Sequence, residues 1–490
     1  MSTEDGSIEK NMATLLSLEE RFNVADWELF GIQLWPIIKH ISFFDFKEGY
    51  KRKESKNLVK ALSVLKEKIK NKIQFFKERS NNSDLSTLPS SDIFFCGANS
   101  YFSEWENKNL NKFFDPIIDE LPYRSIYFNY SNVDLPNTYQ PNRSFNIYSY
   151  LNAAKGLLEK RENKISLLRE YIYKNPNLDQ VLVELSINLK VSHKKLIDIL
   201  YDKLMKIDEW RRVWLLIIDK VNPKVGVVLC YYDISMYGLI LALRERRIPS
   251  VDMQHGGQGI GHPAYSYFPK HYKGFNLLPD YFWVWDDVSS ENIKRWNKFT
   301  YHKVIVGGNP WIRKFMKMKT KNDYDHRYII CTLPADKSYY RLMPDPLLDA
   351  ISKSSSEYIF GFRFHPKTTK YGKQSVIDIV NKKSLSDRVE FIESNSKPLP
   401  YLFSKAWAHI SVGSIGSIAE AAIIGVSKNI VLDRIGVKYY SKLIEEGRAF
   451  YFDIDSGEDL LSFICRIENS HEEFTENWPS YKSLFDQILK

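Results

Sequence analysis

The chain has 490 residues, of which 44% are hydrophobic, 14% aromatic and 26% charged, and this ordinary globular composition at such a length predicts two or three domains. No apolar run reaches the ~18 residues of a membrane span, and the polar start MSTEDGSIEKN lacks the apolar core of a signal peptide. Four scattered cysteines form neither a metal spacing nor a disulfide framework, so we expect a reduced, cytoplasmic protein.

The formal net charge of +9 is concentrated in one segment. Residues 47–79 carry 12 Lys and Arg against 4 Glu, a surplus of +8. Apolar residues recur there at helical spacing: Leu58, Leu62, Leu65, Ile69, Ile73 and Phe76. This pattern indicates either a helix packed on the body or a basic amphipathic helix that docks on an anionic membrane. No nucleic-acid-binding module accompanies the charge, so nucleic acid is not expected as a partner.

The first half of the chain reads as a helical region followed by an α/β domain. Residues 1–90 are predicted to be helical and basic, and they end in a polar linker, residues 80–92. The runs IFFCG (93–97) and SIYFNYS (125–131) read as strands, and residues 150–220 read as a helical insertion. From residue 223 short apolar strands alternate with helices, at PKVGVVLCYYD, IPSVDMQHGG, PDYFWVW and KVIVGGNP. This alternation predicts a parallel, doubly wound sheet over residues 91–315.

A second α/β unit follows a charged connector. Strands are predicted at RYIICTLP, EYIFGFRFHP, DRVEFIE, AWAHISVGS and KNIVLD, with helices between them. This second domain is expected over residues 326–470, and residues 471–490 are expected to form a helix that returns to the first domain. Ligands bind at the carboxyl ends of parallel strands, so the cleft between the two units is the predicted site.

Candidate catalytic residues lie at two strand ends of the first domain. Asp233 ends one strand before a helix, where a carboxylate serves as helix cap or as general base. His255, in Gln254-His255-Gly256-Gly257, follows the next strand, where an imidazole can accept a proton near neutral pH. Asp252 precedes it and is expected to orient the ring. The flanking residues are expected to position substrate: Gln254, Gly256, Gly257 and Asn309.

Candidate anion-binding residues lie at two strand ends of the second domain. His365-Pro366-Lys367 places an imidazole and an ammonium where both can meet a phosphate. The run SVGSIGSIAEAAIIG (411–425) starts a helix near Ser417, and its N–H groups and hydroxyls favour an anion. Glu420 is one turn further on and can reach ribose hydroxyls, or it can complete a capping box with Ser417. The candidate nucleotide and phosphate ligands are His365, Pro366, Lys367, Ser414, Gly416, Ser417 and Glu420.

The order of these motifs resembles a clan of bacterial transferases. An H-G strand end, an H-P strand end and an S-x-x-S helix start with E-A-A are shared with bacterial sialyltransferases, Kdo transferases of capsule and lipopolysaccharide synthesis, and teichoic-acid glycerophosphotransferases. Residues 223–257 also resemble UDP-GlcNAc 2-epimerases. The resemblance covers roughly residues 223–435 and implies a GT-B fold, with two Rossmann-like domains facing a cleft. The paired-acid motif of sialyltransferases is not found, which argues against sialic acid as donor sugar.

The resemblance implies a glycosyltransferase of bacterial surface-polysaccharide synthesis. In the clan, the H-P histidine and the helix-start serines bind the phosphate of a cytidine-nucleotide donor, which suggests that role for His365, Ser414 and Ser417, with the base at Asp233 or His255. The expected donor is CMP-activated Kdo or another nonulosonic acid, and the acceptor is a glycan or lipid-linked glycan. The protein itself is expected in the cytoplasm or peripherally at the inner face of the plasma membrane. No D-x-D motif stands out, so no metal or other cofactor is expected. The alternatives are a UDP-sugar transferase, a UDP-sugar 2-epimerase-like enzyme and a non-catalytic polysaccharide-assembly protein.

Overall fold

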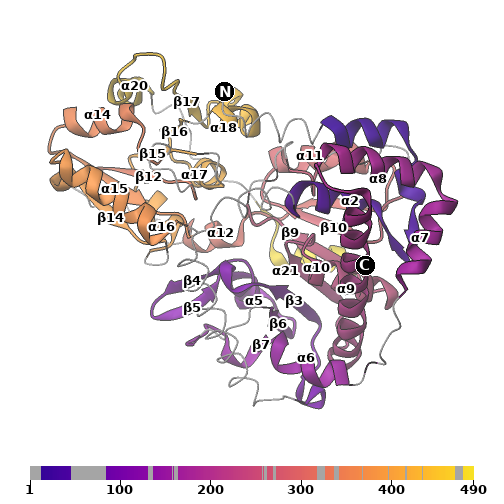
Figure 1. The fold of residues 1–490 in the computed structure, drawn as a ribbon. Coiled ribbons are helices and arrows are strands. Elements are labelled where there is room, and N and C mark those ends of the chain that lie inside the picture. The colour runs from indigo at the N-terminus through magenta and orange to yellow at the C-terminus, as the bar shows by residue number, and fades with distance from the viewer. Residues whose placement is uncertain are drawn as a thin grey trace, which may run out of the picture.

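The computed structural model contains two α/β domains side by side, each built on a parallel sheet (Figure 1). The described residues are 13–45, 84–130, 136–156, 158, 164–256, 258, 262–266, 268, 272–316, 326–335, 342–366, 368–394, 397–413, 416–432, 434–468 and 478–490. The basic segment 47–79 lies outside this set, so its two interpretations stay predictions.

The first domain has a seven-stranded sheet in the order β11-β10-β9-β8-β3-β6-β7, with every neighbouring pair parallel. Its central strands are buried on both faces because helices cover them, which explains their continuous apolar runs. The strands are β3 (Ile93–Gly97), β6 (Ser125–Asn129), β7 (Ser144–Asn146), β8 (Val225–Leu229), β9 (Ser250–Met253), β10 (Tyr281–Val284) and β11 (Lys303–Val306).

Helices cover this sheet and confirm the predicted helical insertion. The longest, α9, packs along α10 and buries Trp214 against the sheet residues Phe94 and Phe128 (Figure 1). A small antiparallel hairpin, β4–β5, projects from the loop after β3. The further elements are β1 (Glu28–Leu29), β2 (Ile32–Gln33), α2 (Trp35–His40), β4 (Phe102–Trp105), β5 (Lys108–Asn111), α5 (Asp115–Glu120), α6 (Ile147–Gly156), α7 (Ile165–Lys174), α8 (Pro176–Asn188), α9 (His193–Val221), α10 (Ile234–Glu245), α11 (Asp287–Asn297) and α12 (Pro310–Met316).

The second domain has a six-stranded parallel sheet in the order β14-β13-β12-β15-β16-β17. Its strands are β12 (Arg327–Thr332), β13 (Tyr358–Arg363), β14 (Val389–Ile392), β15 (Ala408–Ser411), β16 (Asn429–Val431) and β17 (Phe450–Tyr451). Its helices are α14 (Asp345–Lys353), α15 (Lys370–Lys382), α16 (Leu399–Phe403), α17 (Ser417–Ile424), α18 (Arg434–Tyr439), α19 (Ser441–Glu445) and α20 (Leu460–Arg466). Two Rossmann-like domains in this arrangement confirm the predicted GT-B fold class.

A continuous apolar cluster joins the domains. Phe113 and Phe114 of the first domain belong to the same buried cluster as Ile392 and Ile418 of the second. Helix α12 contributes by packing against α16 and α17 (Figure 1). The domain boundary is therefore a packed surface, and residues next to these apolar contacts face across it.

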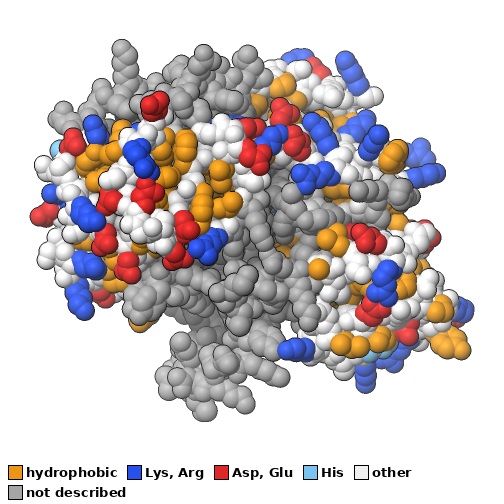
Figure 2. All heavy atoms as spheres, turned by 90° about the horizontal axis from the view of Figure 1, so that it is seen from above, with side chains coloured by type: hydrophobic (Ala, Val, Ile, Leu, Met, Phe, Trp, Pro, Cys, Tyr) orange, Lys and Arg blue, Asp and Glu red, His pale blue; other side chains and the backbone are white. Residues whose placement is uncertain are grey.

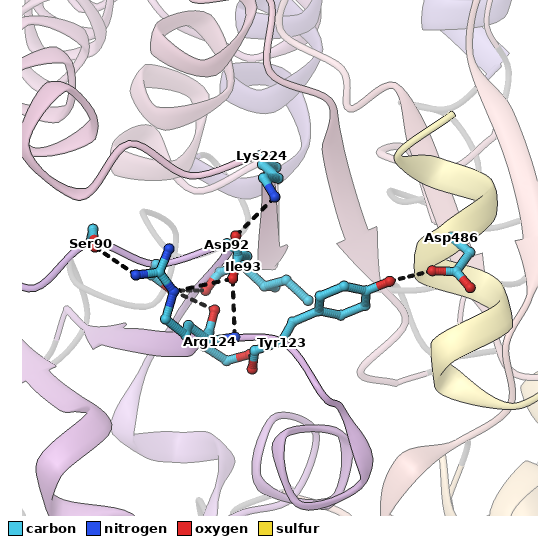
Figure 3. A network of polar contacts seen from close by, with 9 residues as sticks. Ser90, Asp92, Ile93, Tyr123, Arg124, Lys224 and Asp486 are labelled. Atoms are coloured by element: carbon cyan, nitrogen blue, oxygen red, sulfur yellow. Dashed lines mark hydrogen bonds and ion pairs between the residues drawn. The ribbon is translucent and has the colours of Figure 1, made fainter.

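The last helix, α21 (Tyr481–Ile488), lies on the first domain although it follows the second in sequence (Figure 1). The Tyr123 hydroxyl donates to the carboxylate of Asp486, and Phe485 packs against Trp283 with ring centroids 6.0 Å apart. Figure 3 shows this contact beside the Asp92 carboxylate, which pairs with Arg124 at 3.4 Å and Lys224 at 3.1 Å. The chain thus crosses the domain boundary twice.

No helix in the described part of the chain is long and apolar enough to cross a membrane. On the face shown in Figure 2, acidic and basic side chains of the described residues are interspersed. Among the described residues drawn there, no large surface of one charge sign is seen.

Candidate functional site

The carboxyl end of β8 carries a backbone feature that sequence reasoning missed. Cys230 adopts φ +64°, in the left-handed region that non-glycine residues rarely occupy. Its carbonyl accepts a 2.9 Å hydrogen bond from the N–H of Asp233. This tight turn begins α10, and the Asp233 carboxylate caps that helix by accepting from the N–H of Ser235 at 2.9 Å and its hydroxyl at 2.6 Å. The capping role considered for Asp233 is therefore present.

His255 follows β9, the neighbour of β8, and aromatic rings surround it. Its ring centroid lies 5.3 Å from that of Tyr101 and 6.3 Å from that of Tyr232. Burial lowers the pKa of His255 to about 4, so the ring is neutral at pH 7. It can accept a hydrogen bond from a hydroxyl, but it holds a proton less well than we expected from an ordinary imidazole.

Asp252 does not orient His255, contrary to our expectation. Its two carboxylate oxygens accept from the Tyr231 N–H at 3.0 Å and the Tyr265 hydroxyl at 2.9 Å. Burial raises the pKa of Asp252 to about 8, because the loss of solvation outweighs these two bonds. Asp252 is thus part of the core beneath the strand end.

Gln254 and Asn309 form hydrogen bonds within the protein, although we expected them to contact the substrate. The Gln254 side chain accepts from the N–H of Trp285 at 2.8 Å and donates to the carbonyl of Gly256 at 3.0 Å, which locks the ends of β9 and β10 together. Asn309 Oδ1 accepts from the N–H of Trp311 at 3.0 Å at the start of α12. Its Nδ2 is buried and has no hydrogen-bond partner among the described residues. Gly257 lies outside those residues.

His365 and Pro366 follow β13, at the carboxyl edge of the second sheet. The His365 carbonyl accepts from the N–H of Thr368 at 2.9 Å, which closes the turn toward α15. Thr368 is buried, and its hydroxyl has no partner in the described part of the chain. Lys367 and Ser414 are outside the described residues, so their predicted phosphate contacts stay predictions.

The capping box considered for Ser417 and Glu420 is not formed. Gly416 is the N-cap of α17, with no side chain bonded to the first turn, and its carbonyl accepts from the Glu420 N–H at 3.1 Å. The Ser417 hydroxyl instead lies 2.9 Å from the hydroxyl of Thr332. No side chain among the described residues caps the first N–H groups of this helix, and the Glu420 carboxylate is left for another role.

Three charged residues meet where the domains join. Glu420 and Arg363, at the end of β13, come from the second domain, and Lys112, after β5, comes from the first. Burial raises the pKa of Glu420 to about 7, with Lys112 and Arg363 opposing the shift. Burial likewise lowers the pKa of Lys112 and brings that of Arg363 to about 10. Among the described residues, neither Lys112 nor Glu420 has a side-chain hydrogen bond or ion pair.

Arg363 is held in place by carbonyl groups. Its guanidinium donates to the carbonyl of Glu393 at 3.2 Å and to that of Ser394. These acceptors carry no charge, so the guanidinium keeps its full positive charge at the domain boundary. The arrangement of Arg363, Lys112 and Glu420 can bind a ligand with both anionic groups and hydroxyls.

The β4–β5 hairpin connects the two candidate regions. Tyr101, just before it, packs against His255, and Lys112, just after it, interacts with Glu420. Sequence reasoning missed Tyr101 and Lys112, which lie in a loop-like stretch, and Arg363, which resembles an ordinary strand residue. The available signal was the position of Arg363 two residues before His365.

No group of three or more His, Cys, Asp or Glu in the described part of the chain is placed to hold a metal ion. Metal-independent chemistry stays a prediction.

No protein-family model and no curated protein matches the chain. Among solved structures, UDP-GlcNAc 2-epimerase from Methanocaldococcus jannaschii is 14% identical with a TM-score of 0.45, over 81% of this chain and 99% of that one. The Neisseria meningitidis UDP-GlcNAc 2-epimerase bound to UDP-GlcNAc is 13% identical with a TM-score of 0.45, over 81% and 99%. MurG of Acinetobacter baumannii is 13% identical with a TM-score of 0.36, over 58% and 80%. The two-domain fold assigned above follows from the strand order of this chain's own sheets.

Proposed function

We propose that the protein is a glycosyltransferase that takes its sugar from a nucleoside diphosphate donor, with uridine diphosphate as the favoured carrier. The observation that carries this proposal is the charge cluster of Lys112, Arg363 and Glu420 beside the start of α17, which no described side chain caps. A diphosphate at this position would meet two cations and free backbone N–H groups. Glu420 would accept from ribose hydroxyls.

The placement of the charges favours a diphosphate over the CMP-activated donor that the sequence resemblance implied. A CMP-activated nonulosonic acid carries one negative charge on its phosphate diester and the other on the sugar carboxylate. Lys112 and Arg363 together supply two positive charges, and Glu420, with a pKa of about 7, offsets only part of them near neutral pH. A nucleoside diphosphate sugar places both negative charges on adjacent phosphates, and its leaving diphosphate is stabilised by the two cations as charge develops.

The reaction would use the two strand ends on either side of the β4–β5 hairpin. The acceptor hydroxyl would lie on the His255 side, where the neutral imidazole or the Asp233 carboxylate takes its proton. The diphosphate would leave on the Lys112 and Arg363 side. Capsule or lipopolysaccharide as the product, and docking of residues 47–79 on a membrane, remain predictions from the sequence.

Isothermal titration of the full-length protein with UDP, UMP and CMP tests the donor class. We expect UDP to bind most tightly, and we expect Lys112→Gln to reduce the affinity for UDP more than that for UMP. If CMP binds as tightly as UDP or more tightly, the cytidine-nucleotide donor is favoured instead. Turnover of a UDP-sugar that needs an added glycan acceptor supports a transferase. Epimerisation of the UDP-sugar without any acceptor would instead show that the protein is an epimerase. Absence of nucleotide binding would favour a non-catalytic polysaccharide-assembly protein.

A further inference from the structure

A chain of four buried polar side chains lies beneath the first turn of α17, and the mechanism proposed above does not use it. Asn429 of β16 contacts His409 of β15, with Oδ1 and Nδ1 2.7 Å apart. His409 Nε2 lies 2.8 Å from the hydroxyl of Thr332, at the end of β12. That hydroxyl lies 2.9 Å from the hydroxyl of Ser417. The four side chains are at most 6% exposed.

The position of each proton in this row of four side chains follows from the orientation of the Asn429 amide. Its Nδ2 donates to the carbonyls of Ile418 at 3.0 Å and Arg448 at 3.2 Å, so the oxygen Oδ1 must face His409. Because Oδ1 only accepts, His409 Nδ1 carries the hydrogen. Burial lowers the pKa of His409 to about 4, so the ring is neutral at pH 7 and its Nε2 has a free lone pair.

The donor and acceptor of the two remaining hydrogen bonds, Thr332–His409 and Thr332–Ser417, are then determined. The Thr332 hydroxyl donates to His409 Nε2, and its oxygen must therefore accept from the Ser417 hydroxyl. The only proton on Ser417 Oγ points inward, so this oxygen offers lone pairs alone to anything that binds above α17.

We propose that His409 is a positioning residue that acts through Thr332 to make Ser417 a hydrogen-bond acceptor toward the bound ligand. A phosphate oxygen without a proton cannot bond to such a group, so the donors for phosphate are the backbone N–H groups, Lys112 and Arg363. Ser417 and Glu420 lie one helical turn apart on α17, and the Ser417 hydroxyl and the ionised Glu420 carboxylate both accept. This face of the helix therefore selects a ligand hydroxyl, and the assignment of that hydroxyl to a nucleotide sugar rests on the proposed function.

Nitrogen NMR tests the proton assignment without any ligand. The full-length protein is labelled with ¹⁵N-histidine, and a two-bond ¹H–¹⁵N spectrum at neutral pH reports which ring nitrogen is protonated. His409→Gln identifies the signal by its loss. We expect a protonated Nδ1 and a bare Nε2, whereas free histidine prefers a proton on Nε2. A protonated Nε2 would overturn the proposal.

Binding of two probes tests the consequence. Inorganic pyrophosphate at alkaline pH presents almost no proton donor, whereas UDP presents ribose hydroxyls. Thr332→Val removes the inward partner of Ser417, so its hydroxyl is free to donate to phosphate. We expect the affinity for UDP relative to pyrophosphate to fall by roughly three- to tenfold, which is the effect of one hydrogen bond, and we expect Thr332→Ser to restore it.

An unchanged ratio of the two affinities in a folded Thr332→Val protein would refute the selection of a ligand hydroxyl. If the wild type binds neither probe, the proposed function fails. The NMR measurement then decides the proton assignment by itself, so the two failures are distinguishable.

Discussion

The backbone N–H of Lys112 donates a 3.0 Å hydrogen bond to the carbonyl of Tyr101, which closes the base of the β4–β5 hairpin. Tyr101 packs against His255, and Lys112 interacts with Glu420 of the other domain. The hydrogen bond therefore fixes the spacing between Tyr101, which neighbours the candidate base His255, and Lys112, which would face the proposed diphosphate. A shift of this hairpin would change both regions together.

Lys112→Gln should weaken UDP binding by about tenfold, because it removes a charge-assisted contact to phosphate. Lys108→Gln is the matched control, since Lys108 is an exposed residue on the same hairpin whose ammonium lies 5.6 Å from the Tyr139 ring centroid. Titration calorimetry of both variants measures the difference. Equal affinities for Lys112→Gln and Lys108→Gln would remove Lys112 from the site.

Asp233→Asn separates capping from catalysis. Asparagine caps a helix about as well as aspartate, so the variant should keep the wild-type stability. If the carboxylate is the general base, kcat should fall by roughly 10²–10⁴-fold while donor affinity changes little. Asp459→Asn is the control, because Asp459 caps α20 by accepting from the Ser462 N–H at 2.8 Å, in the other domain. An unchanged kcat in Asp233→Asn would show that Asp233 is not the general base and would favour His255.

Asp252→Asn should change the pH dependence of stability. The folded-state pKa of Asp252 is raised from 3.8 to about 8, so its favourable contribution is complete below about pH 4 and is lost as pH rises through about 8. The wild type should lose stability between about pH 4 and about pH 8, and Asp252→Asn should lose less over this range.

Thermal unfolding across this pH range measures the effect. Asp219→Asn serves as control, because the hydrogen bond from Arg246 lowers the pKa of Asp219 and places its titration below the range. A constant difference in Tm between Asp252→Asn and the wild type would contradict the raised pKa.

The sheets were predictable because their strands are short apolar runs that end in turn residues. The run IFFCG gave β3 with its observed bounds, and AWAHISVGS contained β15. The strands β7 (Ser144–Asn146) and β17 (Phe450–Tyr451) were missed, because they have only three and two residues, none of them fully buried, and so leave no continuous apolar run in the sequence.

The site was only partly predictable, for a physical reason. Asp233, His255 and Glu420 lie at strand ends or helix starts, which the sequence pattern locates. Lys112 acquires its role only when the two domains pack together, and no local pattern encodes that distance. Likewise Asp252 seemed placed to orient His255, but alternation along β9 turns its side chain toward Tyr231 and Tyr265.

We expect Phe485→Ala to destabilise the first domain, although residue 485 follows the second domain in sequence. The Phe485 side chain is fully buried, with its ring centroid 6.3 Å from that of Phe95 and 6.0 Å from that of Trp283. Removing a buried phenyl ring leaves a cavity and typically costs about 3–5 kcal/mol.

Denaturant unfolding followed by tryptophan fluorescence measures the loss, and Lys482→Gln is the control on the same helix. Lys482 is exposed and pairs with Asp486 at 2.6 Å, so this substitution should change stability by less than about 0.5 kcal/mol. Because Trp283 lies against Phe485, the transition of the first domain should shift to lower denaturant. A Phe485→Ala protein as stable as Lys482→Gln would mean that α21 adds little to the first domain, and the packing of Phe485 against β3 and β10 would then contribute no net stability.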